Sequence, residues 1–295
     1  MSLPTAATAH PQPGLSAYVE LAKLRITALV MFTALVGFVA AAPEAPAGTV
    51  LVAALLGTGL VSAGASVFNM LLERDSDALM VRTRMRPLPS GRLRPVEALA
   101  FGVAVTAAGL GLLAWQCGTL AAAVALVTWL SYVFLYTPLK PVTSLATIVG
   151  AVPGALPPVI GWAAARGSLD VGAGILFAIL FLWQIPHFLA IAWMYREDYA
   201  RGGFPMLPVL DQQGRMTARQ SFANAVALLL VSLLPTAVGL AGPWYLAGAL
   251  LLGLAFVAAA FRLLRRRDVA SARRLFLASV IYLPLLTSLL MIDRR

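Results

Sequence analysis

The sequence predicts an all-α integral membrane protein, built as a bundle of nine transmembrane helices. The chain of 295 residues is 60% hydrophobic and only 12% charged, whereas a soluble protein carries about a quarter charged residues. A helix needs about 20 apolar residues to cross a bilayer, and consecutive runs of this length cover almost the whole chain. Backbone groups in lipid must be satisfied within their own segment, so helices are the expected form.

The expected spans follow one another with short connections. They cover residues 26–43, 48–72, 96–115, 119–137, 145–164, 172–194, 222–240, 243–262 and 274–291. We expect a flexible cytoplasmic tail over residues 1–19 and a single transmembrane domain over residues 20–295. The only cysteine, Cys117, excludes an internal disulfide and a cysteine-based metal cage.

The distribution of lysine and arginine predicts how the chain is oriented. With the N-terminus in the cytoplasm, only Arg166, Arg294 and Arg295 of the 22 basic residues fall on the outer side. Basic residues accumulate in cytoplasmic loops of membrane proteins. We therefore expect a multi-pass protein of the cell (inner) membrane, surrounded by lipid, with its C-terminus outside. The net charge of +10 is explained by these loops, so no nucleic-acid partner is expected.

An acidic pattern ends the second span. Glu73, Asp75 and Asp77 are three of only twelve acids in the chain. Asn69, Glu73 and Asp77 are spaced i, i+4, i+8, which places them in a column on one helix face, while Asp75 points away. Mg²⁺ prefers a few such oxygens together with water and substrate phosphate. The column predicts a magnesium–diphosphate site; the alternative is a solvated helix end held by salt bridges.

A second acidic pair ends the sixth span. Glu197 and Asp198 follow that span directly, and the predicted topology brings them to the same membrane face as the column. Both are therefore candidate metal ligands.

Basic residues lie close to both acidic segments. Guanidinium groups match phosphate oxygens in a bidentate way, so Arg82, Arg84 and Arg86, together with Lys140 and Arg201, are candidates to bind a departing diphosphate. The alternatives are an ordinary cytoplasmic loop or contact with anionic lipid headgroups.

His187 is the second candidate centre. It follows Gln184 and Pro186 inside the sixth span, and polar residues within a span are costly and often functional. The side chain is suited to contact a metal centre, shuttle a proton or orient a carboxylate. The alternative is a histidine that hydrogen-bonds between two helices.

Together these segments resemble the haem-modifying branch of the UbiA superfamily of intramembrane prenyltransferases. The superfamily motif N-x-x-x-D-x-x-x-D corresponds to Asn69, Glu73 and Asp77. The resemblance covers most of residues 20–290, and its further motifs are MVRTRMRPL from Met80, YTPLKPVTSLATIVGAVPGALPPVIGW from Tyr136, WQIPHF from Trp183 and REDYARGGFPMLPV from Arg196.

The resemblance implies a helix bundle around a central cavity. It also implies transfer of farnesyl from farnesyl diphosphate to the 2-vinyl group of haem B, with addition of water, giving haem O. Mg²⁺ is the implied cofactor, and a haem A synthase or an oxidase-assembly protein is the implied partner. The implied site residues are Asn69, Glu73, Asp77 and His187 for catalysis, Arg82, Arg86, Lys140, Tyr136, Arg201 and Tyr199 for substrate, and Asn69, Glu73, Asp77, Glu197 and Asp198 for metal.

The chain departs from the family pattern at three places. Glu73 replaces the first aspartate, Leu24 stands where the family has a kink-forming proline, and Glu197 and Asp198 are adjacent instead of forming D-x-x-x-D. Two other functions remain open. One keeps the fold and prenylates a quinone precursor or a chlorin, and the other is a secondary transporter with an intramembrane acidic ion site. Clustering of the acids at one membrane face, away from the midplane, argues against the transporter.

Overall fold

The computed structural model of the protein describes residues 14–42 and 48–295. Their regular secondary structure is helical, and an isolated bridge between Ala241 and Arg294 is the only β-type contact among them. The elements are α1 (Leu15–Leu21), α2 (Leu24–Ala41), α3 (Gly48–Leu72), α4 (Arg74–Leu79), α5 (Pro95–Gln116), α6 (Thr119–Leu130), the π-helix η1 (Ser131–Tyr136), α7 (Thr137–Leu139), α8 (Ala146–Ala155), α9 (Pro157–Arg166), α10 (Val171–Met194), α11 (Arg196–Arg201), α12 (Leu207–Leu210), α13 (Arg215–Val231), α14 (Leu234–Ala237), α15 (Pro243–Arg266) and α16 (Val269–Ile292).

Nine helical stretches within the described residues are long and apolar enough to cross a membrane, which confirms the predicted fold class. The largest difference in bounds is the seventh stretch, which begins at Arg215 and not at residue 222. Its first turns are polar, so the helix starts before the apolar layer that hydropathy detects. Residue 43, the predicted end of the first span, lies outside the described residues.

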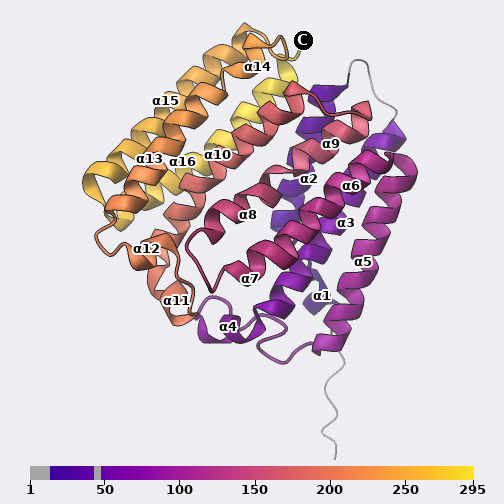
Figure 1. Cartoon of the computed structure of the whole chain (residues 1–295), viewed down its shortest axis with the longest axis vertical. Coiled ribbons are helices and arrows are strands. Elements are labelled where there is room, and N and C mark those ends of the chain that lie inside the picture. Colours follow the sequence, from indigo (N-terminus) through magenta and orange to yellow (C-terminus); the bar gives the residue numbers. More distant parts are fainter. Residues whose placement is uncertain (1–13, 43–47) are drawn as a thin grey trace, which may run out of the picture.

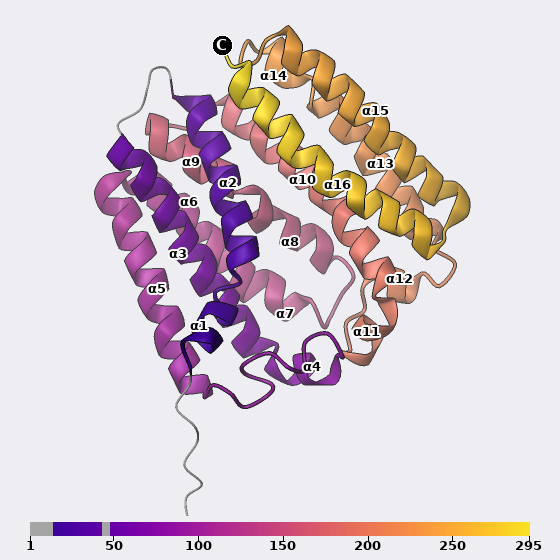
Figure 2. The same cartoon turned by 180° about the vertical axis from the view of Figure 1, so that it is seen from behind.

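The helices form two groups that lie side by side (Figures 1 and 2). One group holds α2, α3, α5, α6 and α9, with Phe38, Leu113 and Ile160 in its core. The other holds α10, α13, α15 and α16, packed around Phe256 and Tyr282. In both views α4 and α11 lie at one end of the bundle, which we call the α4–α11 end, and the C-terminus lies at the opposite end.

Small residues allow neighbouring helices to approach closely. A Cβ atom on Gly161 would lie 1.9 Å from the carbonyl oxygen of Ala34. A Cβ atom on Gly154 would lie 1.9 Å from Gln184 Oε1. The amide of Gln184 in turn donates to the Ala151 carbonyl at 3.2 Å, so this polar residue of the sixth span links α10 to α8.

A break at Lys23 separates α1 from α2. Lys23 has a φ of 46°, and the left-handed region costs an L-residue roughly 1–2 kcal/mol. The break therefore exists although Leu24 stands where the family has proline. The segment predicted as a tail, residues 1–19, is described only from Gly14, and its last residues belong to α1.

Candidate functional site

Asn69, Glu73 and Asp77 lie on one helical face at the α4–α11 end. A one-residue junction separates α3 from α4. The amide of Glu73 nevertheless donates to the Asn69 carbonyl at 2.9 Å, and the amide of Asp77 donates to the Glu73 carbonyl at 2.7 Å. The i to i−4 pattern thus continues through the junction and keeps the column in line. All three side chains are buried, and Asp77 is 0% exposed.

Both acids of the column face a basic residue. Lys140 Nζ donates to Oε1 and Oε2 of Glu73 at 3.0 and 3.1 Å, and Arg86 Nη1 lies 2.6 Å from Asp77 Oδ2. Burial alone would lower the pKa of Lys140, but the surrounding Tyr136 and Glu73 outweigh it and raise that pKa. Lys140 therefore stays protonated beside Glu73.

Lys23 is a third basic residue of this cluster, and it was not among the predicted site residues. Its Nζ donates to Asn69 Oδ1 at 3.1 Å, and Asn69 Nδ2 donates to Thr137 Oγ1 at 3.3 Å. Burial, followed by the charge of Arg86, lowers the pKa of Lys23 to about 7. Three basic groups thus surround two carboxylates, and an anion such as a diphosphate would balance the cluster.

One carboxylate oxygen of the column has no partner. Asp77 Oδ1 is buried and forms no hydrogen bond. Such an unsatisfied buried oxygen lowers the stability of the fold by about 1–3 kcal/mol, which a bound ligand would offset. Among the residues described, no three His, Cys, Asp or Glu side chains are grouped closely enough to hold a metal by themselves. Mg²⁺ takes few protein oxygens and completes its shell with water and phosphate. Asn69, Glu73 and Asp77 therefore fit a magnesium ion that binds together with a diphosphate.

Asp198 anchors the loop that follows α4. Its Oδ1 accepts from the Val81 amide at 3.2 Å and its Oδ2 from the Arg82 amide at 3.3 Å, and Arg201 pairs with Oδ1. Burial raises the pKa of Asp198, but the hydrogen bonds from Arg201 and the two amides outweigh it and lower that pKa. The two acidic helix ends therefore meet through residues 81–82, and Asp198 remains charged.

Aromatic rings lie against two basic side chains near the acidic segments, Arg82 and Lys140. The guanidinium of Arg82 lies 5.5 Å from the ring centroids of both Tyr195 and Tyr199, and Arg82 Nη2 donates to Tyr199 Oη at 3.4 Å. Lys140 Nζ lies 4.8 Å from the ring centroid of Phe204 and 5.8 Å from that of Tyr136. Lys140 thus touches residues of both segments.

Two predicted members lie outside these contacts. Glu197 is exposed, whereas its neighbour Asp198 is buried, so only Asp198 of this pair faces the loop after α4. Arg84 is also exposed and has no acidic partner among the described residues. Asp75, which the spacing places off the column, pairs with Arg74 at 3.0 Å on the surface.

His187 belongs to α10 and contacts α16. Its Nδ1 is 2.7 Å from Ser279 Oγ, and its ring stacks on Trp183 at 4.9 Å and packs against Phe276 at 5.2 Å. Because Ser279 Oγ donates to the Phe276 carbonyl, Nδ1 carries the hydrogen and Nε2 keeps its lone pair. The interhelical hydrogen bond expected as an alternative is therefore present, and Nε2 is left available.

Lys23, Thr137 and Phe204 were missed from the sequence. All three residues lie in or next to segments that carry the family resemblance: Lys23 directly precedes Leu24, Thr137 belongs to the motif from Tyr136, and Phe204 belongs to the motif from Arg196. That signal was available, but it does not show which side chains of a motif meet the column. A π-helix, which often marks functional sites, runs from Ser131 to Tyr136 directly before Thr137. It brings Tyr132 within 5.3 Å of Tyr136, measured between ring centroids.

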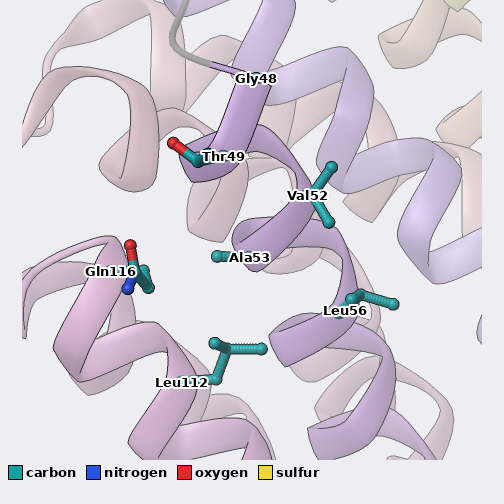
Figure 3. A pocket seen from close by; sticks show the side chains of 7 residues that line it. All are labelled: Gly48, Thr49, Val52, Ala53, Leu56, Leu112 and Gln116. Carbon is teal, nitrogen blue, oxygen red and sulfur yellow. The ribbon is translucent and has the colours of Figure 1, made fainter.

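A separate hollow lies between the start of α3 and the end of α5 (Figure 3). Its volume is about 440 Å³, and Gly48, Val52, Leu56, Leu112 and Gln116 are among its lining residues. No charged side chain lines it. Leu56 precedes Asn69 by 13 positions, or roughly 20 Å of helix. This hollow is therefore not the diphosphate site.

A match over most of the chain shows the family to which it belongs. A family model described as the UbiA prenyltransferase family matches residues 30–283. The chain belongs to the UbiA prenyltransferase family. This UbiA prenyltransferase is 47% identical to the protoheme IX farnesyltransferase of Solibacter usitatus, over 94% of this chain and 98% of the relative. It is 45% identical to that of Myxococcus xanthus, over 99% and 97% of the two chains. Membership sets aside the transporter.

Solved structures share the fold of this UbiA prenyltransferase. A structure of digeranylgeranylglyceryl phosphate synthase has a TM-score of 0.80 and 18% identity, and the match covers 95% of this chain and 98% of that one. A UbiA homologue from Archaeoglobus fulgidus bound to GPP and Mg²⁺ has a TM-score of 0.65 and 15% identity, with 93% and 99% covered. At these identities the likeness concerns the fold alone.

Proposed function

We propose that this enzyme transfers the farnesyl group of farnesyl diphosphate to the 2-vinyl group of haem B, forming haem O. The main support for this proposal is the sequence identity of 47% and 45%, over nearly the full length, to two protoheme IX farnesyltransferases. The buried column of Asn69, Glu73 and Asp77 supports the same chemistry, because it offers oxygen ligands beside bases at one end of the bundle.

The diphosphate site is assigned to the residues around the column. Asn69, Glu73 and Asp77, joined by Asp198, would hold Mg²⁺, which when bound stabilises the charge of the leaving diphosphate. The bases that already contact these acids are placed to bind the diphosphate oxygens. These substrate residues are Arg82, Arg86, Lys140 and Arg201, with Tyr136 and Tyr199 as the rings that position Lys140 and Arg82.

The reaction breaks the bond between farnesyl C1 and the diphosphate oxygen, and the diphosphate leaves with the electron pair. The vinyl group of haem B then attacks C1 as a π nucleophile, and a new carbon–carbon bond forms. Water adds to the resulting cation and loses a proton, which leaves the hydroxyl group of haem O. Water must be kept away until the first bond has broken, and the apolar helices around a central cavity would provide that exclusion.

His187 is proposed to contact the haem. Its Nδ1 is fixed by Ser279 at 2.7 Å, so Nε2 is the atom available to the haem iron or to a proton. Trp183 and Phe276 pack on the imidazole and hold its orientation.

The membrane location and the orientation of the enzyme are inferred from the distribution of its basic residues. We place it in the cell membrane with a cytoplasmic N-terminus and an outer C-terminus, since only Arg166, Arg294 and Arg295 fall outside. Residues 20–295 are proposed as one domain, preceded by a tail over residues 1–19. A haem A synthase or an oxidase-assembly protein is the proposed partner, because haem O needs a further oxidising step.

An acceptor panel tests the proposal. Purified protein in detergent is given farnesyl diphosphate, Mg²⁺ and, separately, haem B, a quinone precursor or a chlorin, and products are identified by mass spectrometry. We expect a farnesylated, hydrated haem from haem B alone. Prenylation of the quinone precursor or the chlorin, with no haem product, would reassign the acceptor while keeping the family.

A further inference from the structure

A dense group of arginines lies at the α4–α11 end of α13, α15 and α16, outside the site described above. Its members are all exposed. We call them the arginine surface: Arg215, Arg219, Arg262, Arg265, Arg266, Arg267, Arg273 and Arg274. They come from the start of α13, the end of α15 and the start of α16.

Ring packing places these helix ends at the same level. Phe222 of α13 and Phe261 of α15 have ring centroids 5.8 Å apart. Arg219 lies about one turn from Phe222, and Arg265 lies about one turn from Phe261 in the same direction. The short connection between α15 and α16 then adds Arg273, so the three helices contribute to one surface.

Six other basic residues of this end are held in ion pairs, whereas the arginine surface forms none within the described residues. Arg74, Arg86, Arg92, Arg94, Lys140 and Arg201 each pair with an acid. None of the eight members of the arginine surface forms an ion pair within the described residues. Asp268 is the one acid between residues 262 and 274, and it caps α16 by accepting from the Ser271 amide at 2.7 Å. The charge of Asp268 acts on Arg266 and Arg262, but one carboxylate cannot balance eight arginines, so most of the positive charge of this surface is left for an external anion.

The same helix faces continue into apolar surface. On α15, Leu251 and Leu254 are 71% and 58% exposed. Leu251 lies eleven residues before Arg262 and Leu254 lies eleven residues before Arg265, so each leucine shares a helix face with one of these arginines. On α16, Leu277 and Ile281 are 49% and 57% exposed and follow Arg273 at i+4 and i+8. An amphiphile with an anionic head and apolar tails matches this order of side chains.

We propose that the arginine surface binds the phosphate headgroups of anionic phospholipids, whose acyl chains lie along the exposed faces of α15 and α16. Arginine suits phosphate because its fork of donors binds two oxygens at once. A basic cluster beside a membrane span gains about 1 kcal/mol for each residue near an anionic leaflet. The proposal does not depend on the acceptor or on the metal, so it stands apart from the proposed function.

Native mass spectrometry of the purified full chain tests it. Phosphatidylglycerol and phosphatidylcholine with identical acyl chains are offered at equal mole fraction, and retained lipids are counted. We expect wild type to retain phosphatidylglycerol about tenfold better. The variant R262Q/R265Q/R266Q/R273Q should lose that preference, and the matched lysine variant at the same positions should keep most of it.

Two further arms distinguish lipid binding at this surface from a general effect of charge and from binding of free phosphate. The control R74Q/R92Q/R94Q/R166Q removes the same charge from ion-paired arginines and should retain wild-type preference. Inorganic phosphate alone should neither raise the melting temperature as phosphatidylglycerol does nor abolish lipid retention at millimolar concentration.

Three outcomes would overturn the proposal. They are an unchanged preference in the glutamine variant, an equal loss in the control, and full replacement of the lipid by inorganic phosphate. If the glutamine variant does not fold, the wild-type protein is tested at higher salt instead. Raising the ionic strength to about 0.5 M should reduce its preference for phosphatidylglycerol, and an unchanged preference would contradict the inference.

Discussion

Lys140 Nζ lies 3.0 Å from Oε1 and 3.1 Å from Oε2 of Glu73, so the lysine occupies both oxygens of a candidate metal ligand. A metal ion and Lys140 therefore compete for Glu73. When a diphosphate is present, Lys140 has an alternative anion and Glu73 is released for the metal. The pair thus predicts that metal and diphosphate bind cooperatively.

Replacement of Lys140 by methionine tests this competition. We expect Lys140→Met to bind Mn²⁺ or Mg²⁺ alone about tenfold more tightly than wild type, because the buried carboxylate is left without its cation. The melting temperature of the variant should also rise more on metal addition. Arg84→Gln is the control, since Arg84 is exposed and touches no acid. An equal gain in the control, or weaker metal binding in Lys140→Met, would contradict the exchange.

Asp198→Asn should loosen the loop after α4. The neutral amide is a weaker acceptor for the Val81 and Arg82 amides and loses its charge pairing with Arg201, at a cost of about 1–3 kcal/mol. Limited tryptic cleavage after Arg82 should become several-fold faster. Glu197→Gln is the matched control and should leave the cleavage rate unchanged, because Glu197 is exposed. Equal cleavage rates in wild type and Asp198→Asn would refute the anchoring role.

Lys23 predicts a pH-dependent stability. Its pKa is about 7 in the folded protein and about 10.4 when unfolded, so the unfolded state binds more protons between these values and stability rises with pH there. Below pH 7 the penalty of the buried charge is complete. We expect Lys23→Met to raise the melting temperature at pH 6 and to raise it less at pH 9. A gain that is the same at both pH values would show that Lys23 is not desolvated.

His187→Ala should weaken haem binding if Nε2 contacts the haem. We expect a loss of about tenfold in haem affinity, measured by absorbance titration, and a shifted Soret band. Ser279→Ala removes only the partner that fixes Nδ1 and should have a smaller effect with an unchanged band. Full haem binding and full haem O production by His187→Ala would end this assignment.

The sequence was sufficient for the fold and for the acidic column, because both depend on local periodicity. Apolar runs of about 20 residues define spans, and the spacing of Asn69, Glu73 and Asp77 needs only a helix that continues through Leu72. The late start predicted for the seventh span has the same origin, since hydropathy does not report the polar first turns after Arg215.

The partners of these residues were not predictable in the same way. Lys23 meets Asn69 across 46 positions, and His187 meets Ser279 across 92. No local pattern encodes such contacts, because they depend on how helices pack. Because Glu197 and Asp198 are adjacent, the sequence predicted both as metal ligands. Only the structure distinguishes them, since Asp198 is buried against residues 81–82.

The central claim is that Asp77 belongs to a metal–diphosphate site that drives farnesyl transfer to haem. Mass spectrometry of the haems from cells that express wild type or Asp77→Asn, at equal protein levels, tests it most directly. We predict haem O with wild type and at least a hundredfold less with Asp77→Asn, while Asp75→Asn stays near wild type. Wild-type amounts of haem O from Asp77→Asn would contradict the account.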